Sequence, residues 1–269
     1  MNWKKVLTMG MTAVVAAALL TGCGNDAAKS GGNESSAKGK IVVGLDDNYP
    51  PMGFKNEKNE IVGFDVDLAK EAAKRLGREV EFKGIDWSSK EAELKSGRVD
   101  ILWNGLDITE KRKENILFSD PYMDNRQIIF VKKGTTDITD EKSLAGKTVG
   151  TQSSSTAEEY IDNNAELLKS IKEVKKYSDY ISAFMDLENG RLDAIVADEI
   201  TGRYYMSKHP QTLEAVDATV GPVSTFGIGF RKDDQKLRDE VQKVFNDMVK
   251  DGTTAKISEK WFEKDIVKK

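Results

Sequence analysis

The amino-acid sequence predicts an α/β fold with two lobes, because strand and helix patterns alternate along the chain and one such pattern occurs twice. Residues 41–45 form a short apolar run typical of a buried strand, and residues 65–76 follow with apolar side chains at helical spacing. This alternation indicates βαβ units and a mainly parallel sheet flanked by helices. The segment at residues 96–102 (SGRVDIL) returns nearly unchanged at residues 189–195 (NGRLDAI), each time as a helix end followed by a buried strand. The repetition indicates two lobes of similar build.

The first lobe continues after the helix at residues 65–76, which is expected to stop at Gly77. A strand at residues 80–82 comes next, then a helix through Ala92 and Leu94 that ends at Gly97. A buried strand at residues 99–103 completes this set of elements.

The second lobe shows the same order. Its expected elements are a strand at 147–150, a helix from 156, a helix at 179–188 and a strand at 193–196. Apolar runs at residues 127–131 and 227–230 bracket this lobe, so we expect the chain to cross between the lobes twice. A late helical face carries the large apolar residues Leu237, Val241, Val244, Phe245 and Met248. We expect this face to pack back on the first lobe, which would make that lobe discontinuous.

The only cysteine, Cys23, ends the tetrapeptide LTGC after an uncharged apolar run. The run covers residues 6–20, which is shorter than the roughly 20 residues of a membrane-spanning helix but suits a signal peptide. The LTGC sequence resembles the lipobox of bacterial lipoproteins, in which the cysteine is lipidated and becomes the first residue. We therefore expect a signal peptide over residues 1–22 and a lipidated, flexible tether over residues 23–40, rich in Gly and Ser. A plain signal peptide with an incidental cysteine is the alternative.

Composition excludes several classes of function. The net charge is −4 and residues of both charge signs are interleaved along the chain rather than gathered in blocks, so nucleic acid is not an expected partner. One histidine and one cysteine make a transition-metal site improbable, and no cofactor motif or common enzyme signature occurs. The histidine, His209, precedes a proline among polar residues and is expected in a surface loop. No second apolar run is long enough to span a membrane.

Polar residues follow the predicted strands at four places, where ligands of open α/β sheets bind. They are residues 46–49, residues 104–112, residues 153–156 and Asp198. The segment SSSTAEE from residue 153 has overlapping capping-box patterns, which predict either an anion site at a helix N-terminus or simply a well-capped helix.

Several motifs in correct order resemble those of the polar amino acid solute-binding lipoproteins of ABC importers, extracellular solute-binding protein family 3. These motifs are GFDVDL at 63–68, TEKR at 109–112, FSDPY at 118–122, DGT at 251–253 and KWF at 260–262. The resemblance covers the chain from Ile41 onward. It implies the two-lobed periplasmic-binding-protein (Venus flytrap) fold with two hinge crossings. The expected parts are lobe 1 over residues 41–124, lobe 2 over residues 125–226 and a return to lobe 1 over residues 227–269.

The resemblance also implies roles for residues around an interlobe cleft. Arg112 matches the family's clasp for the ligand α-carboxylate, since a guanidinium binds a carboxylate bidentately. The turn at Ser155 and Thr156 matches a main-chain donor to the same carboxylate, and Asp198 matches the α-ammonium ligand. Asp107 departs from the family's usual Ser or Thr; its carboxylate would strengthen the ammonium site or repel the ligand carboxylate, depending on its direction.

For the ligand side chain, the resemblance points to Asp46, Tyr49 and Trp87, which place one carboxylate between aromatic faces. Asn104 and Gly105 border the cleft, whereas Trp103 is expected in the core. A buried carboxylate favours a ligand with a distal cation, and phrases such as IDW at 85–87 and WNG at 103–105 resemble a cystine-binding branch. The expected order is therefore cystine and basic amino acids, then glutamine and histidine, then acidic or aliphatic amino acids.

The expected protein is an exported monomer, extracellular or periplasmic, that is anchored by lipid to the outer face of the cell membrane. Its expected partners are a permease and the ATPase subunits of the importer. An enzyme on the same fold is the alternative, because cyclohexadienyl dehydratases are similar in sequence. Such an enzyme needs a general acid, and only Glu199 is a candidate. A surface adhesin is a third possibility that no residue supports directly.

Overall fold

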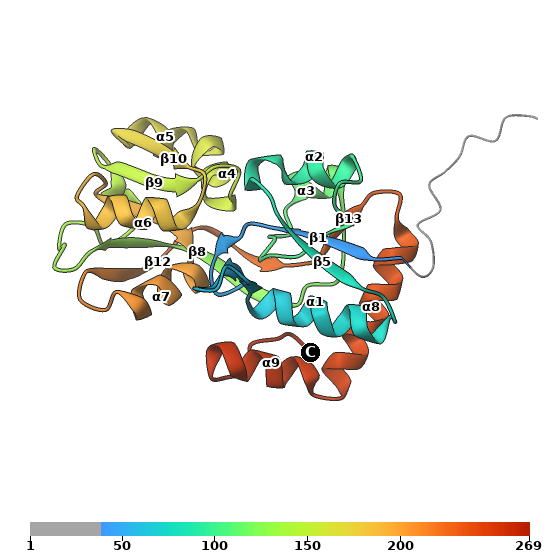
Figure 1. Ribbon diagram of the computed structural model, residues 1–269. Coiled ribbons are helices and arrows are strands. Elements are labelled where there is room, and N and C mark those ends of the chain that lie inside the picture. The colour runs from blue at the N-terminus through green and yellow to red at the C-terminus, as the bar shows by residue number, and fades with distance from the viewer. Residues whose placement is uncertain (1–38) are drawn as a thin grey trace, which may run out of the picture. The chain divides into compact units, whose positions relative to one another are not determined.

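Two five-stranded sheets form the framework of the protein, with a small third sheet and helices packed around them (Figure 1). The computed structural model describes residues 39–269. The expected signal peptide, Cys23 and nearly all of the expected tether lie outside the described residues. Within residues 39–269, no helix has both the length and the apolar character needed to cross a membrane.

The first sheet has the strand order β5-β1-β6-β13-β7. Its central strand β1 pairs in parallel with β5 and β6, whereas β13 runs antiparallel to β6 and β7. The strand bounds are Ile41–Leu45 for β1, Val80–Gly84 for β5, Ile101–Leu102 for β6, Ile116–Phe118 for β7 and Gly229–Arg231 for β13. β1 is apolar throughout because it is covered on both faces.

Helices α1 and α8 cover one face of the first sheet, and α2 and α3 cover the other (Figure 1). The helices of this part are α1, Phe64–Arg75; η1, Trp87–Ser89; α2, Lys90–Lys95; α3, Glu110–Asn115; α8, Gln235–Lys250; and α9, Thr253–Phe262. α8 buries Leu237, Val241, Phe245 and Met248 and contacts β7 and β13. The apolar stripe therefore packs where the sequence predicts.

The second sheet has the order β10-β9-β11-β8-β12. β9 pairs in parallel with β10 and β11, and β8 runs antiparallel to β11 and β12. The strands are β8, Met123–Lys132; β9, Thr148–Gln152; β10, Glu173–Tyr177; β11, Ala194–Asp198; and β12, Leu213–Phe226. The helices are η2, Lys142–Leu144; α4, Thr156–Asn163; α5, Ala165–Ser170; α6, Tyr180–Glu188; and α7, Glu199–Lys208.

Alternate residues of β8 pack into two separate apolar cores. Phe130 packs edge-to-face on Phe184 of α6, whereas Ile129 belongs to the cluster that contains Ala157 and Ile161 of α4. This alternation is the period of two of a β-strand. Together with the parallel strands of both sheets, it confirms the predicted α/β class.

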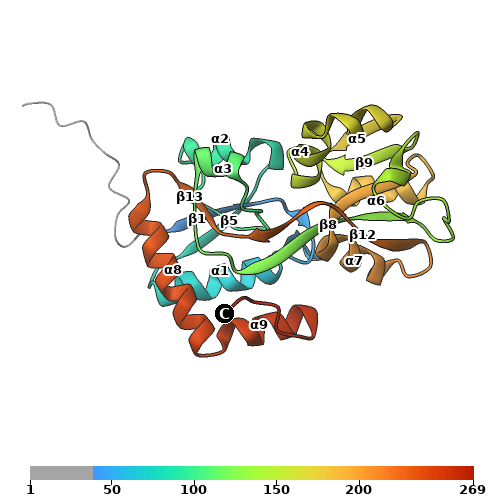
Figure 2. The ribbon, with the colours of Figure 1, turned by 180° about the vertical axis from the view of Figure 1, so that it is seen from behind.

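The strands β8 and β12 run side by side from one sheet to the other (Figure 2). Their pairing extends from Leu213 opposite Lys132 to Phe226 opposite Met123, with register shifts between Val216 and Thr219 and between Val220 and Ser224. A third sheet of short strands, β2 (Asn48–Tyr49), β3 (Gly53–Lys55) and β4 (Ile61–Val62), precedes α1.

The motifs that carry the family resemblance connect distant parts of the chain. Asp65 of GFDVDL is fully buried, accepts the main-chain N–H of Gly105 at 2.7 Å and binds the hydroxyl of Tyr122 of FSDPY at 2.9 Å. Asp67 accepts the indole N–H of Trp261 of KWF at 2.9 Å. Asp65 therefore fixes the turn after β6, which is the turn that borders the site described next.

Candidate functional site

Polar residues from the strand ends of both large sheets surround one small buried cavity. Its lining residues are Tyr49, Trp87, Asn104, Gly105, Asp107, Arg112, Gln152, Ser155, Thr156 and Asp198. The cavity volume is about 10 Å³, roughly the space of one water molecule. The lining includes every predicted ligand-binding residue except Asp46, and it adds Gln152.

Arg112 lies in the first turn of α3, and the helix cap holds it there. Thr109 is the N-cap residue, and its hydroxyl accepts the main-chain N–H of Arg112 at 3.2 Å. The guanidinium is 4% exposed and donates to the main-chain carbonyls of Asp107 and Ser154, each at 3.1 Å. Ser154 belongs to the turn between β9 and α4, so Arg112 connects elements of the two large sheets.

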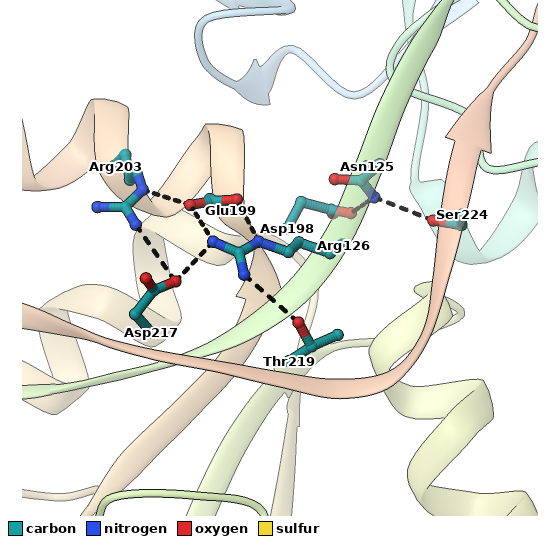
Figure 3. Close-up of polar contacts among 8 residues, drawn as sticks. All are labelled: Asn125, Arg126, Asp198, Glu199, Arg203, Asp217, Thr219 and Ser224. Atoms are coloured by element: carbon teal, nitrogen blue, oxygen red, sulfur yellow. Dashed lines mark hydrogen bonds and ion pairs between the residues drawn. The ribbon is translucent and has the colours of Figure 1, made fainter.

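Asp107 and Asp198 share one amide donor at the crossing strands. Asn125 of β8 donates through Nδ2 to Asp198 Oδ1 at 2.5 Å (Figure 3). The same nitrogen donates to Asp107 Oδ1 at 3.1 Å. Ser224 of β12 donates to Asp107 Oδ1 at 2.6 Å. The carboxylate of Asp107 therefore faces Asp198 and the crossing strands, which is the direction that strengthens an ammonium site. Burial, followed by the charge of Asp198, raises the pKa of Asp107 to about 6.

Asp198 has further partners on both sides of the cavity. The hydroxyl of Tyr49, which follows β1, donates to Asp198 Oδ2 at 2.6 Å, and Gln127 of β8 donates to Oδ1 at 2.6 Å. Gly105 allows Tyr49 to come this close, because a Cβ atom at Gly105 would lie 2.8 Å from Cε1 of the tyrosine ring. The backbone of Gly105 also has φ +56°, the left-handed region that favours glycine.

Asp46 binds across the cleft to Gln152 rather than lining the cavity. Gln152 Nε2 donates to Asp46 Oδ2 at 2.6 Å, and the main-chain N–H of Asn48 donates to Oδ1 at 2.9 Å. The side chain is 5% exposed, and burial raises the pKa of Asp46 to about 6. This carboxylate therefore remains a candidate partner for a distal donor.

The turn before α4 has one unusual backbone conformation. Ser154 has φ +58°, which is uncommon for a residue other than glycine. Ser155 is the N-cap of α4, and its hydroxyl accepts the N–H of Glu158 at 3.1 Å. Thr156 is the first helical residue, whose N–H has no partner within the helix. The capping interpretation of this segment is therefore correct, and the cap leaves the N–H of Thr156 without a helical partner.

The remaining sequence candidates have other surroundings. Trp103 is 1% exposed and packs on Tyr122 and Phe245, so its assignment to the core is confirmed. His209 follows α7 and stacks on Tyr205 with ring centroids 4.2 Å apart. Residues 39–269 contain no cluster of side chains suited to a metal ion.

Glu199, the only candidate acid for the enzyme alternative, is committed to an ion-pair network (Figure 3). Arg126 Nε donates to Glu199 Oε2 at 2.6 Å, and Arg203 Nε donates to Oε1 at 2.6 Å. These hydrogen bonds, above all those from Arg126, lower the pKa of Glu199 to about 2. A carboxyl group that stays ionised at neutral pH cannot donate a proton as a general acid.

Sequence reasoning missed Lys90, Asn125 and Gln152, which contact the predicted site residues. Lys90 is 4% exposed, and Nζ donates to the carbonyl of Ser154 at 2.9 Å. Nζ also lies 5.1 Å from the ring centroid of Trp87, so a cation already occupies one aromatic face that the sequence assigns to a ligand. No sequence pattern marked these residues, because the site groups that they bind, Ser154, Asp198 and Asp46, lie far from them along the chain.

A two-lobed α/β fold with a buried polar site at the strand ends defines the class of solute-binding proteins. The chain matches the bacterial extracellular solute-binding proteins, family 3, over residues 41–264, and it belongs to that family. Its family and these relatives are solute-binding proteins, not enzymes.

The relatives agree with this assignment. The L-cystine-binding protein TcyJ of Escherichia coli (strain K12) is 33% identical over 237 residues, 88% of this chain and 87% of the relative. The L-cystine-binding protein TcyA of Bacillus subtilis (strain 168) is 31% identical over 274 residues, 98% and 99% of the two chains.

Two solved structures share the fold. An ancestral arginine-binding protein bound to arginine has a TM-score of 0.80 and 39% identity, covering 84% of this chain and all of that one (100%). A substrate-binding protein of an ABC uptake transporter from Streptococcus pneumoniae, with bound histidine, has a TM-score of 0.81 and 35% identity, covering 86% and 95%.

Proposed function

We propose that this chain is the substrate-binding component of an ABC importer, and that it captures a polar amino acid between its lobes and delivers it to a membrane permease. The observation that carries the proposal is the separation of charge in one buried site. Arg112 and the N–H of Thr156 offer donors for an anion, whereas Asp107 and Asp198 face each other through Asn125 as acceptors. This arrangement matches the carboxylate and the ammonium of an amino acid.

The proposed lobes are residues 41–124 with 227–269, and residues 125–226. Cross-lobe hydrogen bonds join them at Tyr49 and Asp198 and at Gln152 and Asp46. A ligand therefore enters only when these pairs separate, and its contacts with both lobes favour reclosure.

Asp46 supports a preference for cystine or a basic amino acid. Among residues 39–269, its buried carboxylate accepts only from neutral donors, Gln152 and the N–H of Asn48. A ligand with a distal cation would supply a charged partner, which a buried carboxylate favours. Relatives named for cystine and arginine support that preference, whereas relatives named for histidine bind an amino acid of the second group.

We further propose that lipidation at Cys23 anchors the mature chain to the outer face of the cell membrane. The support is the LTGC sequence after a signal-peptide pattern. The chain would then work as a monomer beside its permease and the ATPase subunits.

A thermal-shift panel of the standard amino acids and cystine tests the proposal. Ligand stabilisation grows as RT ln(1 + [L]/Kd), so the substrate should exceed the rest clearly. Mass spectrometry of the small molecules that co-purify provides an independent identification. Stabilisation by none of these amino acids would refute the proposal, and a largest shift from glutamate or leucine would refute the role of Asp46.

A further inference from the structure

Lys90 is a buried lysine at the edge of the candidate site. It is the first residue of α2 and is 4% exposed. Its Nζ donates to the carbonyl of Ser154 at 2.9 Å and to the carbonyl of Trp87 at 3.3 Å. Lysine is almost never buried to this extent without a paired charge.

Lys90 and Arg112 are two buried cations that direct their donors to one oxygen atom. Lys90 Nζ and Arg112 Nη2 lie 2.9 Å and 3.1 Å from the carbonyl oxygen of Ser154. Within residues 39–269, every hydrogen bond that these two side chains donate ends on a main-chain carbonyl. A neutral carbonyl compensates two buried positive charges only in part.

The acidic residues near Lys90 are engaged elsewhere. Glu91 accepts from Asn115, and Glu158 binds Lys176 and the N–H of Ser154. Glu159 lies 3.9 Å from Lys111. Burial and then the charge of Arg112 lower the pKa of Lys90 to about 7, in spite of these three carboxylates. A buried ammonium without a directly bonded carboxylate is unfavourable, so stability alone does not account for a lysine at this position.

A carboxylate is the group that satisfies both cations. It has two oxygens and several lone pairs, so it accepts from an ammonium and a guanidinium at once. The N–H of Thr156, at the start of α4, belongs to the same turn as Ser154 and adds a third donor.

We infer that Lys90 is a specificity-determining residue, which binds the ligand carboxylate together with Arg112 and makes closure of the lobes depend on that carboxylate. The inference rests on the proposed function. Closing over a carboxylate gives both cations a charged acceptor, whereas closing over an amide or an amine leaves their donors with main-chain carbonyls alone.

The test compares amino acids with their amides. L-arginine, L-histidine and L-cystine are each titrated by calorimetry against the corresponding carboxamide, at about pH 6.5 so that the α-amine stays largely protonated. The variants are Lys90→Met, Lys90→Arg and the control Lys95→Met, an exposed lysine of the same helix. Thermal unfolding of each variant checks that it is folded.

We expect the wild type to bind an acid far more tightly than its amide, and Lys90→Met to reduce that ratio about tenfold or more, about 1.4 kcal/mol per factor of ten. Lys90→Arg should restore much of the ratio, and Lys95→Met should leave it unchanged. An unchanged ratio in Lys90→Met would overturn the inference and leave the proposed function intact. An equal loss of affinity for acid and amide would also overturn it, because Lys90 would then only hold the lobes together. Failure of the wild type to bind any of these amino acids would overturn the proposed function as well.

Discussion

Replacing Asp107 tests whether two carboxylates, rather than one, hold the ligand ammonium. Asp107 is 2% exposed, and its Oδ1 lies 3.1 Å from the same Asn125 nitrogen that lies 2.5 Å from Asp198 Oδ1. An ammonium placed between the two carboxylates is attracted by both. At about 5 Å and an effective dielectric constant of about 20, each attraction is about 3 kcal/mol.

The net effect is smaller than this attraction, because Asp107 must stay ionised in a buried site. We expect Asp107→Asn and Asp107→Ser to weaken binding by about 1–3 kcal/mol, about 5-fold to 150-fold in Kd. The contribution of Asp107 requires its ionised form, and its pKa is about 6. The affinity difference between wild type and variant should therefore be present at about pH 7.5 and fade as the pH falls through about 6.

Calorimetric titration with the best amino acid of the panel, at about pH 7.5 and about pH 5, measures both effects. Asp217→Asn is the matched control, because its side chain is 72% exposed and pairs with Arg126 (Figure 3). Unchanged affinity in both Asp107 variants, or the same pH dependence as the wild type, would refute the two-carboxylate site.

Three further predictions concern substitutions at other positions. Arg112→Ala and Asp198→Asn should each weaken ligand binding by about 2–5 kcal/mol, because each leaves a desolvated charge unpaired; near-native calorimetric affinity in both would place the site elsewhere. Burial raises the pKa of Asp65 to about 7 from 3.8, so the folded state holds this proton more tightly and stability should fall as the pH rises from about 4 to about 7. Urea unfolding at about pH 5 and about pH 8 measures the free energy of unfolding, which should fall less between these pH values in Asp65→Asn than in the wild type. An equal fall in both proteins would contradict this role of Asp65. Cys23→Ser should move the protein from the membrane fraction to the soluble fraction without changing affinity, and equal membrane association would contradict lipidation.

The sequence predicted those elements whose pattern is strong and local. The predicted strand at residues 41–45 coincides with β1, and the helix predicted at 65–76 is α1, shifted by one residue. The strand predicted at 99–103 is shorter, Ile101–Leu102, because only these residues pair with neighbouring strands.

The long strand β12 was missed, and its irregular pairing explains why. The strand spans Leu213–Phe226, but its register shifts twice and Gly221 within it has φ +73°. Each shift breaks the alternation of buried and exposed residues by which a strand is recognised in sequence.

The site was predicted from strand ends and family motifs, which identify residues but not the contacts between them. Lys90 and Gln152 bind partners 64 and 106 positions away, and no local pattern records such pairs. A single lysine in a charged sequence is most simply interpreted as solvated, because lysines are rarely buried. The direction of the Asp107 carboxylate likewise depends on Asn125 and Ser224, from two strands distant in sequence.

The hydrogen bonds between the lobes have a consequence for unloading. Tyr49 binds Asp198 and Gln152 binds Asp46, so groups proposed to recognise the ligand also recognise each other. Binding is then an exchange of partners, and the measured affinity is the difference between two sets of hydrogen bonds. At the proposed permease the same exchange would run in reverse, with Tyr49 and Gln152 again binding Asp198 and Asp46 as the ligand contacts break. These contacts lower the affinity for the departing amino acid, because rebinding has to break them again.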